Sequence, residues 1–358
     1  TLKGYVAQGG FLFVENCCSD PAFERSFLAV MRKLFGSDPA PLPPDHPLWY
    51  AEQQVTPSEK WPLLGINACC RTSIVYCPRP LSCHWELGGV RGITLGGAAA
   101  ADVDTANRIG VNVLAYATNR QLRYRLDTPQ TAARGGQDNQ ALASLRVAKL
   151  SHAGGSDDAP SALKNLLAVL QKTGGVRTAA ETPLIAPQGT ALLEYPIVFM
   201  HGRRGFRHTE AERRALVEYL DRGGFLLIDS ICASEEFTTA VRREMQAWQE
   251  AIPGSRLTRI APDHPLLTDA FGGFKDLSTV QVREPQLRVR PEEPLAVRSV
   301  AQPPQLEALE VDGRILAVFS PLDLSCALEN VASLQCKGYL SDDAARLGVN
   351  LLLFALQQ

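Results

Sequence analysis

The feature of this sequence that constrains its fold most is an internal repeat. The segment YVAQGGFLFVENCC at residues 5–18 reappears as YLDRGGFLLIDSIC at residues 219–232. Three further pairs follow in the same order: PPDHPLW at 43–49 with APDHPLL at 261–267, IVYCPRPLSCHWE at 74–86 with AVFSPLDLSCALE at 317–329, and DTANRIGVNVLAYA at 104–117 with DDAARLGVNLLLFA at 342–355. Colinear blocks of this kind indicate a duplicated domain.

The repeat divides the chain into a first copy at residues 1–120, a polar linker at 121–144 and a second, complete copy at 145–358. The first copy starts at the equivalent of Ala215, so it has no counterpart to residues 145–214. We therefore expect Thr1 to lie inside a helix and the natural protein to extend further at its N-terminus.

Composition excludes several functional classes. Apolar residues make up 45% of the 358 positions and charged residues 21%, as in a folded globular protein. With 36 Lys and Arg against 38 Asp and Glu, there is no electrostatic case for nucleic acid. No apolar run reaches the roughly 18–20 residues of a membrane span. The compartment stays undecided, and a soluble region of a longer exported or membrane-anchored protein fits these counts.

The nine cysteines lack the CxxC spacing of a zinc knuckle, so we expect most of them to be buried small apolar side chains. The sequence predicts neither a metal nor a cofactor.

The second copy alternates between strand and helix patterns. We expect strands at 145–152, 176–181, 195–201, 225–229 and 314–319, the last paired with 306–311 in a hairpin, and helices at 157–172, 209–220, 235–250 and 340–356. Thr209 and Glu212 have the spacing of a capping box. This order predicts an α/β fold with an open, mainly parallel sheet and flanking helices.

The segment FMHGRRGFRHTEAERRALVEYLDRGGFLLIDS resembles the core of class I glutamine amidotransferase-like, flavodoxin-like folds. The motifs GGFLxxD, PPDHPL, SPxDLSCAxE and RLGVNxxxFAL together resemble the bacterial domain of unknown function 4159 family. The resemblance implies the fold, and the family brings no assigned activity.

In the amidotransferase fold the nucleophilic Cys follows the strand equivalent to FLLI. Here Asp229 and Glu15 take that position, whereas Cys232 and Cys18 come three residues later, where we expect a helix to begin. Neither copy has the His-x-Glu pair that would activate a thiolate. Glutaminase chemistry is therefore not expected.

Ligands of open α/β sheets bind beyond the carboxyl ends of the strands. In the second copy those ends bring the following residues toward one cleft: His152, His201, Gly202, Arg203, Arg204, Asp229, Ser230, Ser325, Cys326 and Glu329. His201 with its Gly and Arg neighbours suits a carboxylate or phosphate. The alternative is a His that caps its own turn while both arginines lie in solvent.

Two carboxylates, Asp229 and Glu15, suit a general base or a cation ligand; the alternative is a helix N-cap. The pairs Asp45-His46 and Asp263-His264 lie between prolines and suit acid/base or metal partners; the alternative is a structural turn whose His bonds the backbone.

The Ser-Cys pairs follow a strand in both copies, as Ser82-Cys83 with Glu86 and as Ser325-Cys326 with Glu329. A helix N-terminus there would lower a thiol pKa, so Cys326 with His264 or His201 as base is one reading and a buried Cys the other. Asn112 and Asn350, each in a GVN motif, are expected to anchor a neighbouring loop.

Two functions from different classes fit these residues. The first is a non-catalytic module that binds a small anion or a protein. The second is a hydrolase that uses His201 and Asp229, with or without a divalent cation, or Cys326 as nucleophile. Because a nucleophile and its base need near hydrogen-bond contact, burial of Cys326 or separation of these groups would count against a shared catalytic site.

Overall fold

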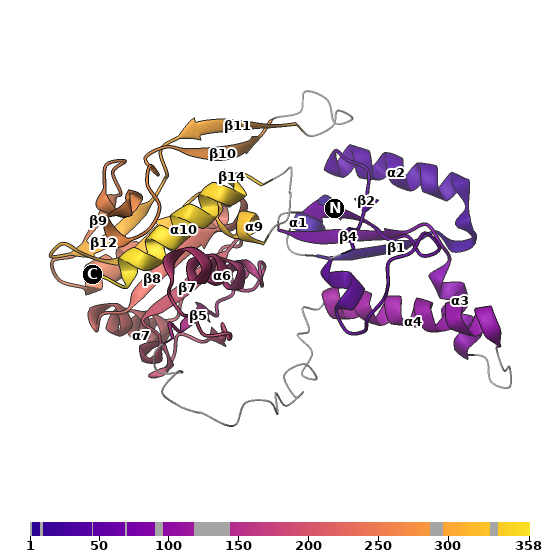
Figure 1. Ribbon diagram of the computed structural model, residues 1–358, viewed down its shortest axis with the longest axis horizontal. Coiled ribbons are helices and arrows are strands. Elements are labelled where there is room, and N and C mark those ends of the chain that lie inside the picture. The colour runs from indigo at the N-terminus through magenta and orange to yellow at the C-terminus, as the bar shows by residue number, and fades with distance from the viewer. Residues whose placement is uncertain are drawn as a thin grey trace. The chain divides into compact units, whose positions relative to one another are not determined.

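The computed structural model describes residues 2–7, 10–44, 46–68, 70–89, 96–117, 144–286, 296–329 and 336–358. Thr1, Asp45 and nearly all of the expected linker lie outside these residues. The chain forms two compact units, one mainly from residues 1–136 and one mainly from residues 137–358, and Figure 1 labels their elements. None of the helices in the described segments combines the length and apolar character that a bilayer crossing requires.

The N-terminal unit is a four-stranded sheet between helices. Its strands run in the order β1 (Leu12–Glu15), β4 (Arg71–Cys77), β3 (Leu64–Ala68) and β2 (Ala40–Pro41). Side chains of β4 alternate between the two faces, as a strand dictates. Ile74 and Tyr76 pack with α2 (Pro21–Phe35), whereas Val75 and Cys77 pack with α4 (Gly97–Ala117). Figure 1 shows α2 on one side of this sheet and α4 with α3 (Leu81–Gly89) on the other; α1 (Leu2–Ala7) precedes β1.

The C-terminal unit contains a seven-stranded sheet. Its order is β6 (Leu184–Ile185), β5 (Val147–Leu150), β7 (Ile197–Gly202), β8 (Phe225–Ser230), β13 (Arg314–Ser320), β12 (Glu307–Val311) and β9 (Arg256–Arg259). The first five strands are parallel and the last two join antiparallel. The prediction of a mainly parallel sheet is therefore confirmed.

Helices cover both faces of this sheet. On one face α6 (Ala162–Gly174) and α10 (Ser341–Ala355) pack on alternate residues of the strands, and on the other face α7 (Glu210–Asp221) and α8 (Glu235–Ala251) do so. The central strands β7 and β8 are buried over their whole length, which explains their continuous apolar sequence. A short helix α9 (Ser325–Leu328) follows β13.

A separate antiparallel sheet has the order β11 (Val297–Gln302), β10 (Val280–Pro285) and β14 (Gly338–Tyr339). It has no counterpart in the sequence-based expectations. Its outer strand β11 is mostly exposed, so its residues carry little of the apolar alternation that predicts a strand.

Local signals in the sequence predict the other elements well. The capping box of Thr209 and Glu212 opens α7, and β12 and β13 pair across Asp312-Gly313. Two expectations are wrong in position. The helix expected from residue 157 begins at Ala162, because Asp157 and Asp158 form ion pairs in a preceding turn. The strand expected at 176–181 makes only one bridge, at Thr178, and the regular strand β6 lies further on.

Candidate functional site at the carboxyl edge of the large sheet

The ends of β7 and β8 place two candidate residues side by side. His201 pairs in register with Asp229, and Gly202 with Ser230. The Asp229 carboxylate accepts hydrogen bonds from the backbone N–H groups of Leu324 (2.8 Å) and Ser325 (2.9 Å). His201 Nδ1 lies 3.1 Å from Ser325 Oγ. The fold thus brings His201, Asp229 and Ser325 into one buried polar cluster.

Burial controls the protonation of this cluster. It lowers the pKa of His201 to about 3, an effect that the nearby charge of Lys149 reinforces. Burial also raises the pKa of Asp229 well above its ordinary value, and repulsion from Asp323 adds to that rise. At neutral pH His201 is therefore an uncharged imidazole, which suits hydrogen bonding within a closed interior.

The expected loop of Gly202, Arg203 and Arg204 folds back on the protein. The backbone N–H groups of both arginines donate to the carbonyl of Gly154, at 2.9 and 3.0 Å. Arg203 Nε (3.0 Å) and Arg204 Nη1 (3.2 Å) both bind the same carboxylate oxygen of Asp158. A Cβ at Gly202 would lie 2.6 Å from the Gly154 carbonyl oxygen, so only glycine fits there.

His152 closes the same loop. Its Nδ1 accepts from the N–H of Gly154 (3.0 Å), and its Nε2 donates to the carbonyl of His201 (2.9 Å). Burial lowers its pKa to about 4. Ser230 Oγ donates to the carbonyl of Ser234 (3.2 Å), at the N-terminus of α8.

Glu329 is partly buried beyond the end of α9. Its carboxylate accepts from the N–H of Ser161 (2.8 Å), ahead of α6. Burial raises its pKa to about 7, although the N–H of Ser161 and the charge of Lys149 oppose that rise. Its counterpart in the N-terminal unit, Glu86, is exposed.

Cys326 is fully buried, and burial raises the pKa of its thiol well above the ordinary value. Asp323, which precedes α9, accepts from the N–H of Cys326 (2.6 Å) and from the N–H of Cys232. The thiol of Cys336 lies 3.2 Å from a carboxylate oxygen of Asp323. A buried carboxylate among sulfur atoms is thus the second polar feature of this edge.

The two PDHP histidines behave alike. Nδ1 of His46 accepts from the N–H of Leu48 (3.1 Å), and Nδ1 of His264 accepts from the N–H of Leu266 (3.2 Å). Each ring therefore caps a short 3₁₀ helix, and neither joins the cluster at the strand ends. Asp263 is exposed beside its histidine.

The remaining candidate residues of the N-terminal unit include two that also hold backbone groups in place. Glu15, at the end of β1, accepts from the N–H of Ser82 (2.7 Å) and bonds its hydroxyl. Cys83 is half-buried. Asn112 Oδ1 accepts from the N–H groups of Glu52 and Gln53, as an anchor of a loop should.

The sharp turn between β8 and α8, called the elbow below, lies later in the sequence than the expected position at Asp229. β8 continues to Ser230, and a 3₁₀ turn at Ile231–Ala233 separates it from α8. Cys232 (φ 57°) and Ala233 (φ 53°) both adopt left-handed backbone, as do Cys18 (φ 60°) and Ser19 (φ 51°) after β1. The expectation that a helix begins at Cys232 and Cys18 is therefore wrong, and these cysteines occupy the sharp turn itself.

Sequence reasoning missed several residues of this edge. Lys149 is buried in the middle of β5 and pairs with Asp157, and a lysine inside the apolar run LRVAKLSH was the available signal. Asp323 and Cys336 were also missed. Asp323 stands two residues before Ser325 in SPLDLSC, where a carboxylate can cap the helix that follows.

Comparison with known sequences places the chain in a family. No curated protein matches the sequence. A family model described as a domain of unknown function (DUF4159) matches residues 1–118 and 146–356. Because these segments span most of its length, the chain belongs to the DUF4159 family.

Proposed function

We propose that this chain is a non-catalytic binding module built on two copies of an amidotransferase-like fold. One observation carries the proposal: the charged side chains at the carboxyl edge are engaged in contacts that hold the fold. Both carboxylate oxygens of Asp229 accept backbone N–H groups, and Glu329 accepts the N–H of Ser161. Arg203 and Arg204 bind the carboxylate of Asp158. Groups so engaged and buried are not presented to a substrate.

The duplication is supported by the two sheets. The order β1-β4-β3-β2 parallels the order β8-β13-β12-β9, and the first pair is parallel in each case. The third and fourth strands are antiparallel in both. The left-handed elbows after β1 and β8, and the caps that Glu15 and Asp229 make, add to this support.

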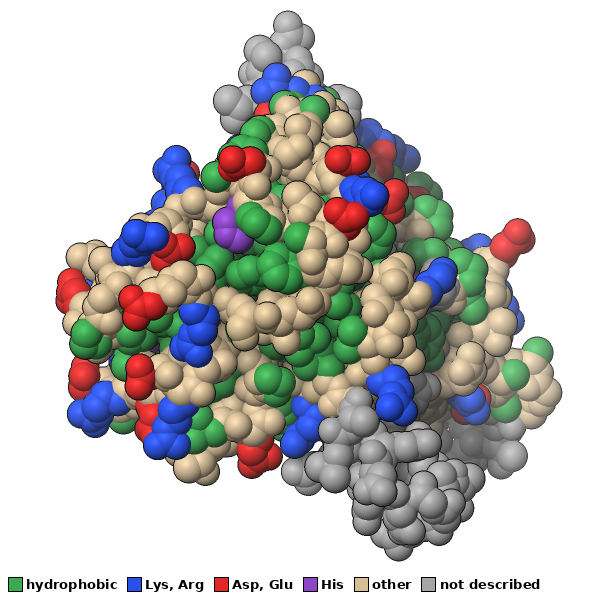
Figure 2. All heavy atoms as spheres, turned by 60° about the vertical axis from the view of Figure 1, so that its left-hand side comes forward, with side chains coloured by type: hydrophobic (Ala, Val, Ile, Leu, Met, Phe, Trp, Pro, Cys, Tyr) green, Lys and Arg blue, Asp and Glu red, His purple; other side chains and the backbone are tan. Residues whose placement is uncertain are grey.

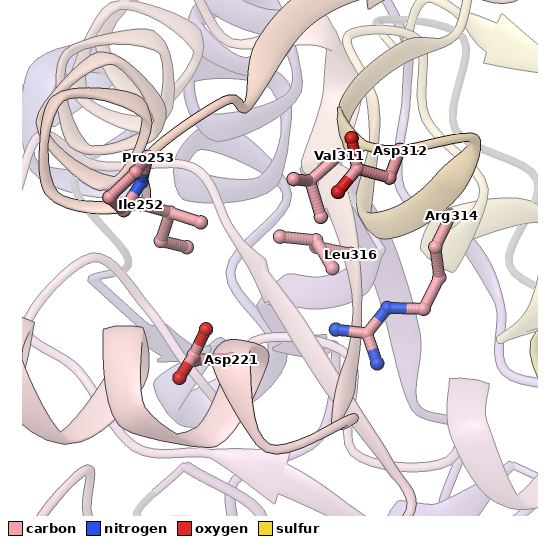
Figure 3. Close-up of a pocket in the computed structure, with 7 residues that line it drawn as sticks. All are labelled: Asp221, Ile252, Pro253, Val311, Asp312, Arg314 and Leu316. Carbon is pink, nitrogen blue, oxygen red and sulfur yellow. The ribbon is translucent and has the colours of Figure 1, made fainter.

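The opposite edge of the large sheet offers a place for a ligand. A hollow of about 400 Å³ is lined by Asp221, Ile252, Pro253, Val311, Asp312, Arg314 and Leu316. Figure 3 shows the side chains of Ile252, Val311 and Leu316 toward its middle, with the charged groups around them. Arg314 donates to the carbonyl of Leu220 (2.8 Å), while Asp221 and Asp312 are exposed.

This lining favours a protein segment over a small anion. Two carboxylates against one guanidinium repel an anion, and an apolar floor suits an aliphatic side chain next to a cationic one. Figure 2 shows a similar mixture on a larger scale: hydrophobic side chains gather near the middle of the face, with charged side chains around them. We therefore propose a basic, partly apolar peptide segment as the partner.

Peptide binding tests this part of the proposal. A blocked peptide with a central Lys between leucines should bind, and the same peptide with Glu should not. Asp312→Asn and Asp221→Asn should weaken the Lys peptide several-fold without changing the melting temperature, because Asn tolerates the left-handed backbone at Asp312 (φ 49°). Asp263→Asn, an exposed carboxylate outside the hollow, is the matched control. Equal binding of both peptides would count against this site.

A hydrolase is the second candidate, and the contact between His201 Nδ1 and Ser325 Oγ favours it. A neutral imidazole next to a hydroxyl has the chemistry of a base and a nucleophile. The burial of Cys326 does not favour the version with a thiol nucleophile. Chromogenic esters, amides and glutamine should be turned over no faster than in buffer if the module only binds. Turnover that Ser325→Ala abolishes and Asp312→Asn leaves intact would support the hydrolase instead.

A further inference from the structure

Four side chains with metal-binding atoms meet beneath the elbow of the C-terminal unit. The sulfur atoms of Cys232, Cys326 and Cys336 and one carboxylate oxygen of Asp323 all lie within 4.8 Å of one another. Asp323, Cys326 and Cys336 are buried, and Cys232 is half-buried. The cluster lies beside the polar groups described above, and the binding function proposed for the chain does not use it.

Separate elements hold these groups in place. Cys232 sits in the 3₁₀ turn after β8, Cys326 in the first turn of α9, and Cys336 just before β14. Asp323 is fixed by the N–H groups of Cys232 and Cys326, and β14 packs against it, since a Cβ at Gly338 would lie 2.5 Å from the Asp323 Cβ. The donor atoms are therefore oriented before any ion arrives.

The buried carboxylates of this region favour the binding of a cation. Asp229 and Asp323 are both buried carboxylates that meet at the start of α9, where Asp229 accepts the N–H of Ser325 and Asp323 accepts that of Cys326. The hydrogen bonds that these two carboxylates receive, within the described chain, come from backbone N–H and thiol groups and from no lysine or arginine. A divalent ion would compensate the buried negative charge.

The spacing of the donor atoms fits tetrahedral zinc. With zinc–sulfur bonds of about 2.3 Å, two sulfur ligands of a tetrahedral site lie about 3.8 Å apart. Cys232 Sγ and Cys326 Sγ are 3.7 Å apart, and Cys336 Sγ lies 3.2 Å from the nearest Asp323 oxygen. Three sulfurs and one carboxylate also match the ligand preference of zinc, whereas calcium and magnesium prefer oxygen alone.

In this structure Cys232 is disulfide-bonded. We propose that reduction of this disulfide completes a zinc site in which Cys232, Cys326, Cys336 and Asp323 bind one Zn²⁺. A dithiol or phosphine reductant supplies the two electrons, and the disulfide takes up two protons to give two thiols. Zinc then binds the three cluster sulfurs as thiolates, and their three protons go to solvent.

Metal binding by the whole chain tests the proposal. The chain is reduced, freed of reductant without oxygen, and titrated with Co²⁺ and then with Zn²⁺. The reduced chain should bind one Co²⁺ with the thiolate-to-cobalt charge-transfer and intense visible bands of a tetrahedral site, and Zn²⁺ should displace it. The oxidised chain, in which the disulfide withholds the Cys232 thiolate, should bind at least about tenfold more weakly.

Variants assign the ligands. Cys336→Ser and Asp323→Asn should each weaken zinc at least about tenfold. The exposed pair Cys17 and Cys18 is the control, because Cys17→Ser/Cys18→Ser removes two accessible thiols outside the cluster and should change nothing. Circular dichroism checks whether each variant folds. If the cluster variants do not fold, the cobalt spectrum of the unaltered chain tests the proposal instead.

Three results would overturn the proposal. These are a reduced chain that binds no metal, a cobalt spectrum without thiolate bands, and binding that the Cys17/Cys18 control abolishes but Cys336→Ser leaves intact.

Discussion

The carboxylate of Asp229, at the end of β8, accepts the backbone N–H of Ser325 at 2.9 Å, 96 residues further along the chain. Glu15, at the end of β1, accepts the N–H of Ser82 at 2.7 Å in the same way. In each unit a carboxylate from one strand thus caps the helix that follows the neighbouring strand. This contact joins two crossovers of the sheet and gives the acid at the end of each strand a structural role.

The first prediction concerns this cap. Asp229→Asn should lower the free energy of unfolding by about 1–3 kcal/mol, because one buried N–H loses its acceptor. Chemical denaturation measures the change. Asp312→Asn, at an exposed turn, is the control and should alter stability by less than about 0.5 kcal/mol. Equal stability of the two variants would mean that the cap contributes nothing.

The second prediction concerns pH. Burial raises the pKa of Glu329 from 4.5 to about 7, so the native state keeps a proton that the unfolded chain has released. The free energy of unfolding should therefore fall as pH rises from 4.5 to 7, by up to about 3 kcal/mol. Glu329→Gln should remove this slope.

Two histidines act in the opposite direction. The lowered pKa values of His201 and His152 mean that stability is lost as pH falls below 6.5. Both histidines are present in the unaltered chain and in Glu329→Gln, so the difference between their denaturation curves isolates Glu329. A difference that does not vary between pH 4.5 and 7 would be incompatible with a buried, protonated Glu329.

The third prediction separates the two capping histidines. His264→Asn keeps an acceptor for the N–H of Leu266 and should cost only a few tenths of a kcal/mol, whereas His264→Ala should cost about 1 kcal/mol. His46 also bonds Thr72 Oγ1 through Nε2 at 2.9 Å, so His46→Asn should cost more than His264→Asn. Thermal unfolding of the three variants ranks these losses, and an equal loss for His264→Asn and His264→Ala would refute the capping role.

The fourth prediction concerns the anchor in α10. Asn350 Oδ1 accepts from the N–H of Phe274, and its Nδ2 donates to the carbonyls of Leu266, Thr268 and Phe274. Asn350→Ala should cost about 3 kcal/mol or more, because it leaves buried polar groups unpaired. Asn350→Asp should cost more still, since a carboxylate would face three carbonyl oxygens. Urea denaturation tests the ranking, and a milder effect of Asp than of Ala would contradict it.

Local signals in the sequence predict much of this fold. Buried parallel strands read as continuous apolar runs, as in residues 197–202, and Thr209 with Glu212 marks a helix start because the cap is made within three residues. The β10–β11–β14 sheet could not be found in this way. β14 pairs with β10 from far along the chain, as Tyr339 with Val282, and β11 is mostly exposed, so no periodic apolar pattern is needed to form it.

The candidate site was predictable in composition and not in geometry. Because strand ends converge, His201, Asp229 and Ser325 could be expected together, and they are. Whether Asp229 faces solvent or a backbone N–H depends on the path of the loop before α9, which no local pattern specifies. The cluster of Cys232 with Cys336 likewise depends on tertiary folding, since 104 positions separate them in the sequence.

Amide hydrogen exchange at Leu324 and Ser325 tests most directly whether the carboxyl edge holds the fold. Two N–H groups bound to a fully buried carboxylate should exchange slowly in the unaltered chain, and Asp229→Asn should accelerate their exchange while β5 keeps its protection. Rapid exchange of both amides in the unaltered chain would contradict the account, because Asp229 would then be free to act on a substrate.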